Sequence, residues 1–256
     1  MTKKKNEENA LTVQNDFAVS SDLAAEFDGL GLGAGEEIDS MDILIPKLML
    51  TQGLTKAVAK GKAKVGTYIN SINLADMGDK VEALVIQSYK VWQVYKVVPN
   101  KADEYVETLD YYGNENLDYN YELEGVLYKR KQVLGFYCLL LDEIKQGLAF
   151  PYIIDFKGAS KSAGRELTSY FAKLRSINLP SFAKVFTFGT ELVEDEHTYY
   201  VKTVDIGRDI TREELGAVKN WIGELKKNKE NIRVHDEEEA PVEGEVINAT
   251  ASGSKF

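Results

Sequence analysis

Apolar and polar residues alternate along six segments of the chain, which is the pattern of half-buried β-strands. These segments are rich in Val, Ile, Tyr and Phe, the side chains that strands favour. They span residues 66–72, 81–98, 133–141, 148–156, 184–189 and 198–206. Because the second segment is eighteen residues long, we expect a β-bulge within it, which would exchange its two faces beyond that point.

Two further segments show the helical period instead. In residues 161–177 one stripe is apolar, and the opposite arc carries several cations with Glu166 as its acidic residue. The stripe consists of Ala163, Leu167, Tyr170, Phe171, Leu174 and Ile177. A second helix is predicted after Thr211, where Thr211 and Glu214 have the spacing of a capping box, and it ends near Ile232. Six strands with two helices predict an α+β or mainly β fold.

The distribution of charge divides the chain into a folded body with acidic flanks. The net charge is −10, yet residues 1–42 hold three Lys against ten Asp and Glu, and residues 234–256 hold one Lys against six. Both segments lack hydrophobic periodicity and are predicted to be a disordered arm and a disordered tail. Residues 43–233 are predicted to form one domain. A Tyr-rich insert at 102–125 contributes eight acidic residues and no basic one, so the rest of the body is basic.

The basic residues of the body recur in three groups. If residues 81–98 alternate strictly, Lys90, Trp92 and Lys96 share one face, and Tyr89, Val91, Gln93 and Tyr95 share the other. Cations beside an aromatic ring suit single-stranded nucleic acid, because bases stack on aromatic faces while cations contact phosphates. The alternative is that Trp92 fills the hydrophobic core. The residues predicted to bind nucleic acid are Lys56, Lys60, Lys62, Lys64, Lys90, Trp92, Lys96, Lys157, Lys161 and Arg165.

Several classes of site are not predicted. Cys138 is the one cysteine, and His197 and His235 are the two histidines, so neither a disulfide framework nor a common zinc motif is expected. No phosphate-binding or dinucleotide-binding glycine motif is present. We therefore predict no catalytic residues, no metal and no cofactor. The N-terminus lacks the apolar segment of a signal peptide and no run is long enough to span a membrane, so a cytoplasmic protein is expected.

The C-terminal tail combines an acidic run with a terminal aromatic residue. We predict that Asp236, Glu237, Glu238, Glu239 and Phe256 bind partner proteins, or that the acidic residues compete for the basic surface of the same chain. The alternative is a tail that only aids solubility.

With its many short strands, its interposed helix at 161–177, its acidic stretch at 236–245 and its final Phe256, the chain resembles the bacteriophage single-stranded DNA-binding proteins. The resemblance implies an antiparallel barrel of the oligonucleotide-binding (OB) type, elaborated with two amphipathic helices and acidic tails. It also implies sequence-independent coating of single strands in phage DNA replication, recombination or repair, in the host cytoplasm. Replication or recombination proteins would be partners of the tail, and homo-oligomers are left open.

Two other function classes stay open. Asp142, Glu143 and Lys145 match part of a Mg²⁺-dependent nuclease centre, in which carboxylates hold the metal and Lys assists. A surface turn with an ion pair is the simpler interpretation of these residues. A protein-interaction or virion-associated module, with the insert at 102–125 as its contact surface, is the non-enzymatic alternative.

Overall fold

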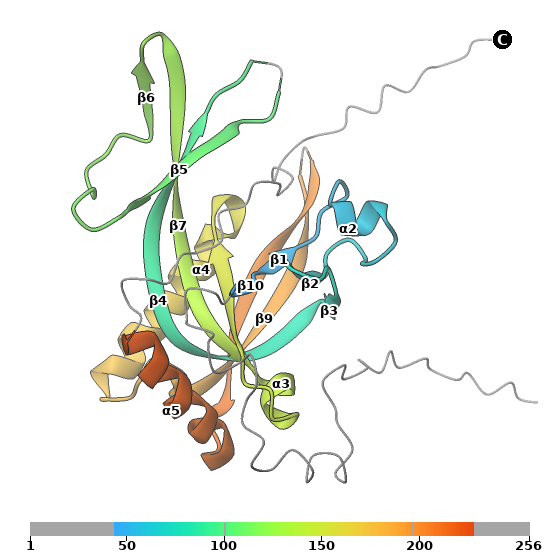
Figure 1. Cartoon of the computed structure of the whole chain (residues 1–256), viewed down its shortest axis with the longest axis vertical. Helices are drawn as coiled ribbons and strands as arrows, with labels where there is room; N and C mark the ends of the chain where they lie inside the picture. Colours follow the sequence, from blue (N-terminus) through green and yellow to red (C-terminus); the bar gives the residue numbers. More distant parts are fainter. Residues whose placement is uncertain (1–43, 100, 196, 228–256) are drawn as a thin grey trace, which may run out of the picture. The chain divides into compact units, whose positions relative to one another are not determined.

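The computed structural model describes residues 44–99, 101–195 and 197–227, which form an α+β fold dominated by antiparallel sheets (Figure 1). The predicted fold class is confirmed to this extent. A small sheet contains β1 (Leu48–Leu50), β2 (Tyr68–Asn70) and β3 (Asp76–Gly78). A seven-stranded sheet contains β4 (Lys80–Lys96), β5 (Glu104–Asp110), β6 (Asn120–Leu123), β7 (Val126–Leu140), β8 (Pro151–Phe156), β9 (Lys184–Glu194) and β10 (Thr198–Asp209). The α-helices are α2 (Lys56–Ala59), α3 (Leu141–Lys145), α4 (Lys161–Ser176) and α5 (Arg212–Lys227).

Strands β4 and β7 form the long central pair of the large sheet (Figure 1). Along residues 80–84, β4 also pairs with β9, which in turn pairs with β10. Along residues 91–96, β4 pairs with β5 instead. In the same way β7 pairs with β8 along one part of its length and with β6 along the other. The sheet therefore has a core half, which includes β8, β9 and β10, and a second half at residues 90–133, which we call the arm.

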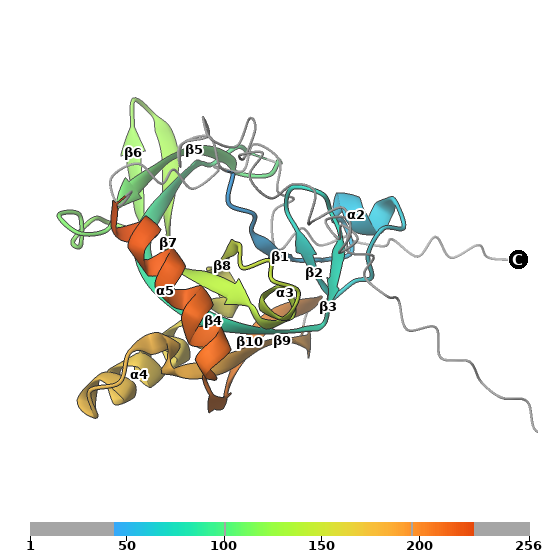
Figure 2. The ribbon, with the colours of Figure 1, turned by 60° about the horizontal axis from the view of Figure 1, so that its bottom comes forward.

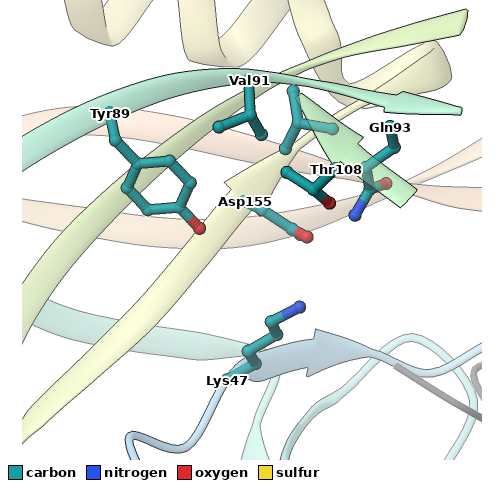
Figure 3. A pocket seen from close by; sticks show the side chains of 7 residues that line it. Lys47, Tyr89, Val91, Gln93, Thr108 and Asp155 are labelled. Atoms are coloured by element: carbon teal, nitrogen blue, oxygen red, sulfur yellow. The ribbon is translucent and has the colours of Figure 1, made fainter. Parts of the chain in front are cut away.

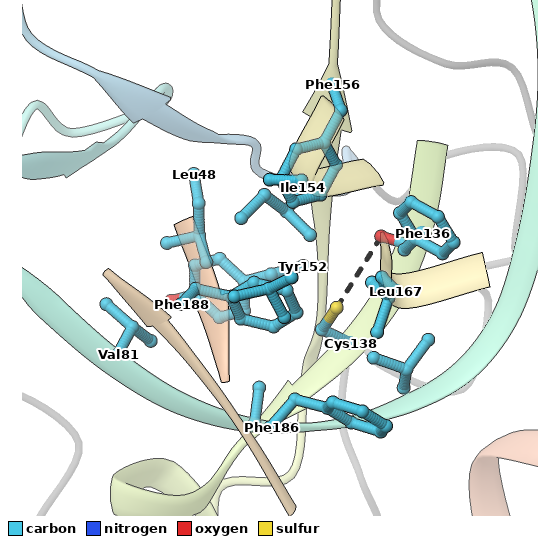
Figure 4. Packing of buried hydrophobic residues seen from close by; sticks show 14 of the residues in the cluster. Leu48, Val81, Phe136, Cys138, Tyr152, Ile154, Phe156, Leu167, Phe186 and Phe188 are labelled. Carbon is cyan, nitrogen blue, oxygen red and sulfur yellow. Dashed lines mark hydrogen bonds between the residues drawn. The ribbon is translucent and has the colours of Figure 1, made fainter. Parts of the chain in front are cut away.

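The larger hydrophobic cluster lies on one face of the core half and is covered by α4 (Figure 4). Side chains from β4, β7, β8, β9 and β10 meet there, and Leu167 and Leu174 of α4 are buried against them, as the apolar stripe predicts. Gly164 explains how closely α4 approaches, because a Cβ at this position would lie 2.7 Å from the Cβ of Phe156. Ile177 departs from the prediction, since it follows the end of α4 and is 64% exposed.

The second hydrophobic cluster lies on the opposite face and is covered by α3 and α5. Figure 2 shows α5 crossing this side of the sheet. The predicted capping box of α5 is present: the backbone N–H of Thr211 donates to the Glu214 carboxylate at 2.8 Å, and the N–H of Glu214 donates to Thr211 Oγ1 at 3.3 Å. Arg208 also donates to both carboxylate oxygens of Glu214. These bonds fix the start of α5 beside the end of β10.

Side chains, and not a strand ladder, bridge β8 and β10 in the described part of the chain. Lys202 on β10 donates through Nζ to the backbone oxygen of Asp155 on β8 at 2.7 Å and to its Oδ1 at 2.9 Å. The backbone N–H of Lys202 donates to Ser160 Oγ at 3.0 Å. The carboxamide of Gln52 exchanges two hydrogen bonds with the backbone of Tyr200. Edge groups of β10 that strand pairing would otherwise satisfy are thus satisfied by side chains.

Three local expectations can be compared with the structure. The predicted bulge in β4 is confirmed, because the pairing with β7 shifts between Val85 and Gln87. The acidic insert contains the whole of β5 and β6, which pair with β4 and β7. Strand β7 begins at Val126, seven residues before the predicted start. The predicted arm at 1–42 and tail at 234–256 lie outside the described residues. None of the described helices is long and apolar enough to cross a membrane.

Candidate nucleic-acid interface

Three of the predicted binding residues come together where β4 passes the start of α4. Lys90 lies in the middle of β4, while Lys161 and Arg165 lie in the first turns of α4. Partial burial, together with the nearby charges of Arg165 and Lys90, lowers the pKa of Lys161 below its ordinary value. We call Lys90, Lys161 and Arg165 the cation cluster.

Two tyrosine rings from the acidic insert lie against the cation cluster. The Nζ of Lys90 is 3.4 Å from the centre of the Tyr111 ring, and the Nζ of Lys161 is 5.9 Å from the centre of the Tyr119 ring. Tyr119 is 57% exposed, so much of its side chain is open to solvent. The cluster therefore pairs positive charge with an accessible aromatic ring.

The cation cluster carries little local neutralisation. None of its three members forms an ion pair with any residue in the part of the chain that the structure describes. Glu115 is close enough to interact with Lys90, and its pKa is lowered mainly by hydrogen bonds from the backbone N–H groups of Gly113 and Glu115, with a smaller contribution from Lys90. Three grouped cations with Glu115 as a nearby counter-charge and no ion pair among the described residues favour binding of an anion.

Trp92 was predicted as a stacking platform, and the structure contradicts this. The Trp92 side chain is 2% exposed, and its Nε1–H donates to the backbone oxygen of Asn114 at 3.0 Å. Its ring contacts Tyr111 with centroids 5.8 Å apart and Tyr119 with centroids 5.3 Å apart. Residues 111–119 of the insert fold over Trp92, so the indole supports the tyrosines and offers no free face to a ligand.

The other predicted cations do not join the cluster. Lys56, Lys60, Lys62 and Lys64 are exposed on α2 and the turn after it, and α2 lies beside the small sheet, away from β5 and β6 of the arm (Figure 1). Lys96 lies further along the same face of β4 as Lys90, opposite Tyr128 of β7. Lys157 lies near Asp155, where it helps to lower the pKa of that carboxyl. The predicted binding residues thus form several separate surfaces.

A small pocket lies on the other face of the β4–β7 pair (Figure 3). Tyr89, Val91 and Gln93 of β4 share this face, as the alternation predicts. The pocket lining also includes Lys47, Thr108, Val133 and Asp155. Burial alone would raise the pKa of Asp155, but Lys202, Lys157 and Lys47 together hold it well below its usual range. The pocket therefore contains a carboxylate that stays ionised because cations surround it.

The basic residues Lys129, Arg130 and Lys131 were not among the predicted binding residues, because β7 was expected to begin at residue 133. In the structure they lie within β7 and alternate between its faces. The Nζ of Lys131 is 4.6 Å from the centre of the Tyr95 ring, and the guanidinium carbon of Arg130 is 3.8 Å from that of Tyr121. The tripeptide Lys-Arg-Lys after Tyr128 was the available signal. Among the described residues, four of the six cation–π contacts involve aromatic rings of the arm.

The residues of the alternative nuclease centre make local contacts instead. Asp142, Glu143 and Lys145 lie on α3, where Lys145 pairs with Asp142 at 2.8 Å. Glu143 accepts a 2.5 Å hydrogen bond from the Tyr152 hydroxyl, and burial raises its pKa. Within the described residues, no group of three or more His, Cys, Asp or Glu side chains could hold a metal ion.

The tail residues Asp236, Glu237, Glu238, Glu239 and Phe256 lie outside the described residues, so their predicted role in partner binding stays a prediction. Comparison of the chain with models of known protein families, with curated proteins and with solved structures finds no match.

Proposed function

We propose that this protein binds single-stranded DNA without sequence preference, and that the cation cluster and Tyr119 form part of the binding surface. The observation that carries the proposal is the convergence of Lys90, Lys161 and Arg165, from two separate elements, beside an exposed aromatic ring. Phosphates would contact the three cations, while an unpaired base would stack on Tyr119. None of these contacts depends on base identity.

The order of strand connections supports the same function. Strands β4, β7 and β8 pair in sequence, α4 follows, and β9 pairs with both β10 and β4. An OB barrel, a fold that binds oligonucleotides, has the same order. It consists of a three-stranded meander, then a helix, then a hairpin whose first strand pairs with the first strand of the meander. The Lys202 side chain, which joins β10 to Asp155 of β8, would then occupy the seam of a partly open barrel.

Within this proposal the biological setting follows from the resemblance to phage proteins. Coating of single strands during replication, recombination or repair would need no cofactor and no turnover. Single-stranded DNA would be bound in preference to a duplex, because bases in a duplex are stacked on each other and cannot stack on a protein ring.

Binding of labelled oligothymidylate, measured by fluorescence anisotropy without Mg²⁺, tests the proposal. The variant Lys161→Ala should bind more weakly, because a phosphate contact is lost, whereas Lys173→Ala should bind like the wild type. Lys173 is exposed and lies further along the same helix, so it controls for the loss of one charge. Absence of single-strand binding by the wild type at low salt would refute the proposal.

A further inference from the structure

A second aromatic and cationic group lies on the arm, at β6 and the start of β7. Tyr121 and Tyr128 are directly opposite each other in the β6–β7 pair, and their rings are nearly parallel, with centroids 5.0 Å apart and planes at 14°. The guanidinium carbon of Arg130 lies 3.8 Å from the centre of the Tyr121 ring. We call Tyr121, Tyr128 and Arg130 the tyrosine stack.

The tyrosine stack is held in place before any ligand arrives. The Nη1 of Arg130 donates to the backbone oxygen of Asp118 at 2.8 Å, and its backbone N–H donates to Tyr119. These bonds fix the planar guanidinium over the ring. All three side chains of the stack are partly exposed, and none belongs to either hydrophobic cluster. A preformed planar surface loses little conformational entropy when another flat group binds.

One donor in the stack lacks a partner. The Nε of Arg130 is the one buried side-chain nitrogen or oxygen without a hydrogen-bond partner among the described residues. This nitrogen is inaccessible to a ligand in the folded arm, so the guanidinium can contribute only its exposed atoms to binding.

The tyrosine stack and the cation cluster share one face of the β4–β7 pair. Tyr128 is opposite Lys96, and Arg130 is opposite Val94, so the stack lies on the same face as Lys90. Lys96 follows Lys90 by six positions, which is about 20 Å along a strand. Trp92 and Val94 are buried between them on this face, so a single strand that contacts both groups would pass over the residues of the insert that cover Trp92.

We infer that the tyrosine stack binds an unpaired nucleobase by stacking, while the cation cluster binds phosphates. The inference rests on the proposed function and adds a division of roles within the surface. It predicts that the tyrosine stack makes the affinity for an oligonucleotide with bases higher than the affinity for an abasic one. The cation cluster should contribute equally to both affinities.

The test compares two oligonucleotides of about 12 nucleotides, within the site sizes known for single-strand binding. One is oligothymidylate, and the other has the same phosphates but abasic sites in its central part. The wild type should bind the abasic strand at least about fivefold more weakly, the low end for one stacked base. In Tyr121→Leu and in Arg130→Lys, which keeps the charge but not the planar group, this preference should shrink. In Lys161→Ala both strands should weaken equally, so that the preference is retained.

The outcomes separate the inference from the proposed function. Failure of the wild type to bind either oligonucleotide would refute both. Binding with an unchanged preference for bases in Tyr121→Leu and Arg130→Lys would overturn the inference alone. Because the preference is a ratio measured within one protein, a lower fraction of folded protein would weaken binding of both strands equally and leave the preference unchanged. Tyr112→Leu, which removes a tyrosine of the same arm that is 77% exposed, is the matched control and should retain the preference.

Discussion

Replacing all three residues of the cation cluster by alanine should flatten the salt dependence of binding to single-stranded DNA. Each phosphate contact on a single strand contributes about 0.7 to the slope of log K against log salt, so three contacts contribute about 2. A fourfold rise in salt, roughly from 50 to 200 mM, should then cost the wild type about 20-fold more affinity than the variant. The three side chains are not part of either hydrophobic cluster, so the variant should keep its fold.

The assay is a series of anisotropy titrations with labelled oligothymidylate at several NaCl concentrations, accompanied by a thermal melt of each protein. The control replaces Lys173, Arg175 and Lys219, three exposed cations outside the cluster, and so removes the same formal charge. Its slope should stay close to that of the wild type. A wild-type slope in the cluster variant, or equal flattening in the control, would show that the phosphates are bound elsewhere.

Three further predictions concern stability. Trp92→Ala should lower the free energy of unfolding by about 3–5 kcal/mol in a denaturant titration, because the side chain is buried; a loss below 1 kcal/mol would contradict this. Asp155→Ala should cost about 3–5 kcal/mol by leaving Lys202 buried without its partner, and adding Lys202→Met should recover much of that loss. Arg208 holds the pKa of Glu214 at about 2, below its ordinary 4.5. The pair should therefore stabilise the fold fully above pH 4.5 and lose this effect as the pH falls toward 2, and thermal melts of Arg208→Ala should lack that part of the acid dependence.

Local patterns predicted the parts of the fold that depend on neighbouring residues. The capping box at Thr211 and Glu214 forms as expected, since both bonds lie within one turn of chain. The two faces of β4 also follow the alternation, with Tyr89 and Gln93 on the side opposite Lys90 once the bulge is passed. In both cases the geometry is set by the repeat of the backbone itself.

The burial of Trp92 could not be predicted in the same way. Its cover comes from residues 111–119, which the sequence presents as a polar, acidic loop. Alternation gives the direction in which a side chain points but not what the insert places over it. The contact of residues 111–119 with Trp92 depends on the pairing of β5 with β4. The register of that pairing cannot be predicted from the sequence of either strand alone.

The cation cluster was predicted as separate residues and not as one site. Lys90 and Lys161 are more than seventy positions apart, and their proximity depends on how α4 packs against the core half. That packing needs the close approach that Gly164 permits. The tyrosine stack was not predicted for a different reason. Tyr128 and Arg130 lie in a part of β7 that is rich in polar residues and lacks the hydrophobic pattern by which strands are recognised.

The most direct test of the central claim compares binding of the wild-type protein to a single strand and to its duplex at low salt without Mg²⁺. The account predicts tight binding of the single strand, weaker binding of the duplex, and affinity for the single strand that falls steeply as salt increases. Equal binding of both forms, or binding of neither, would contradict it.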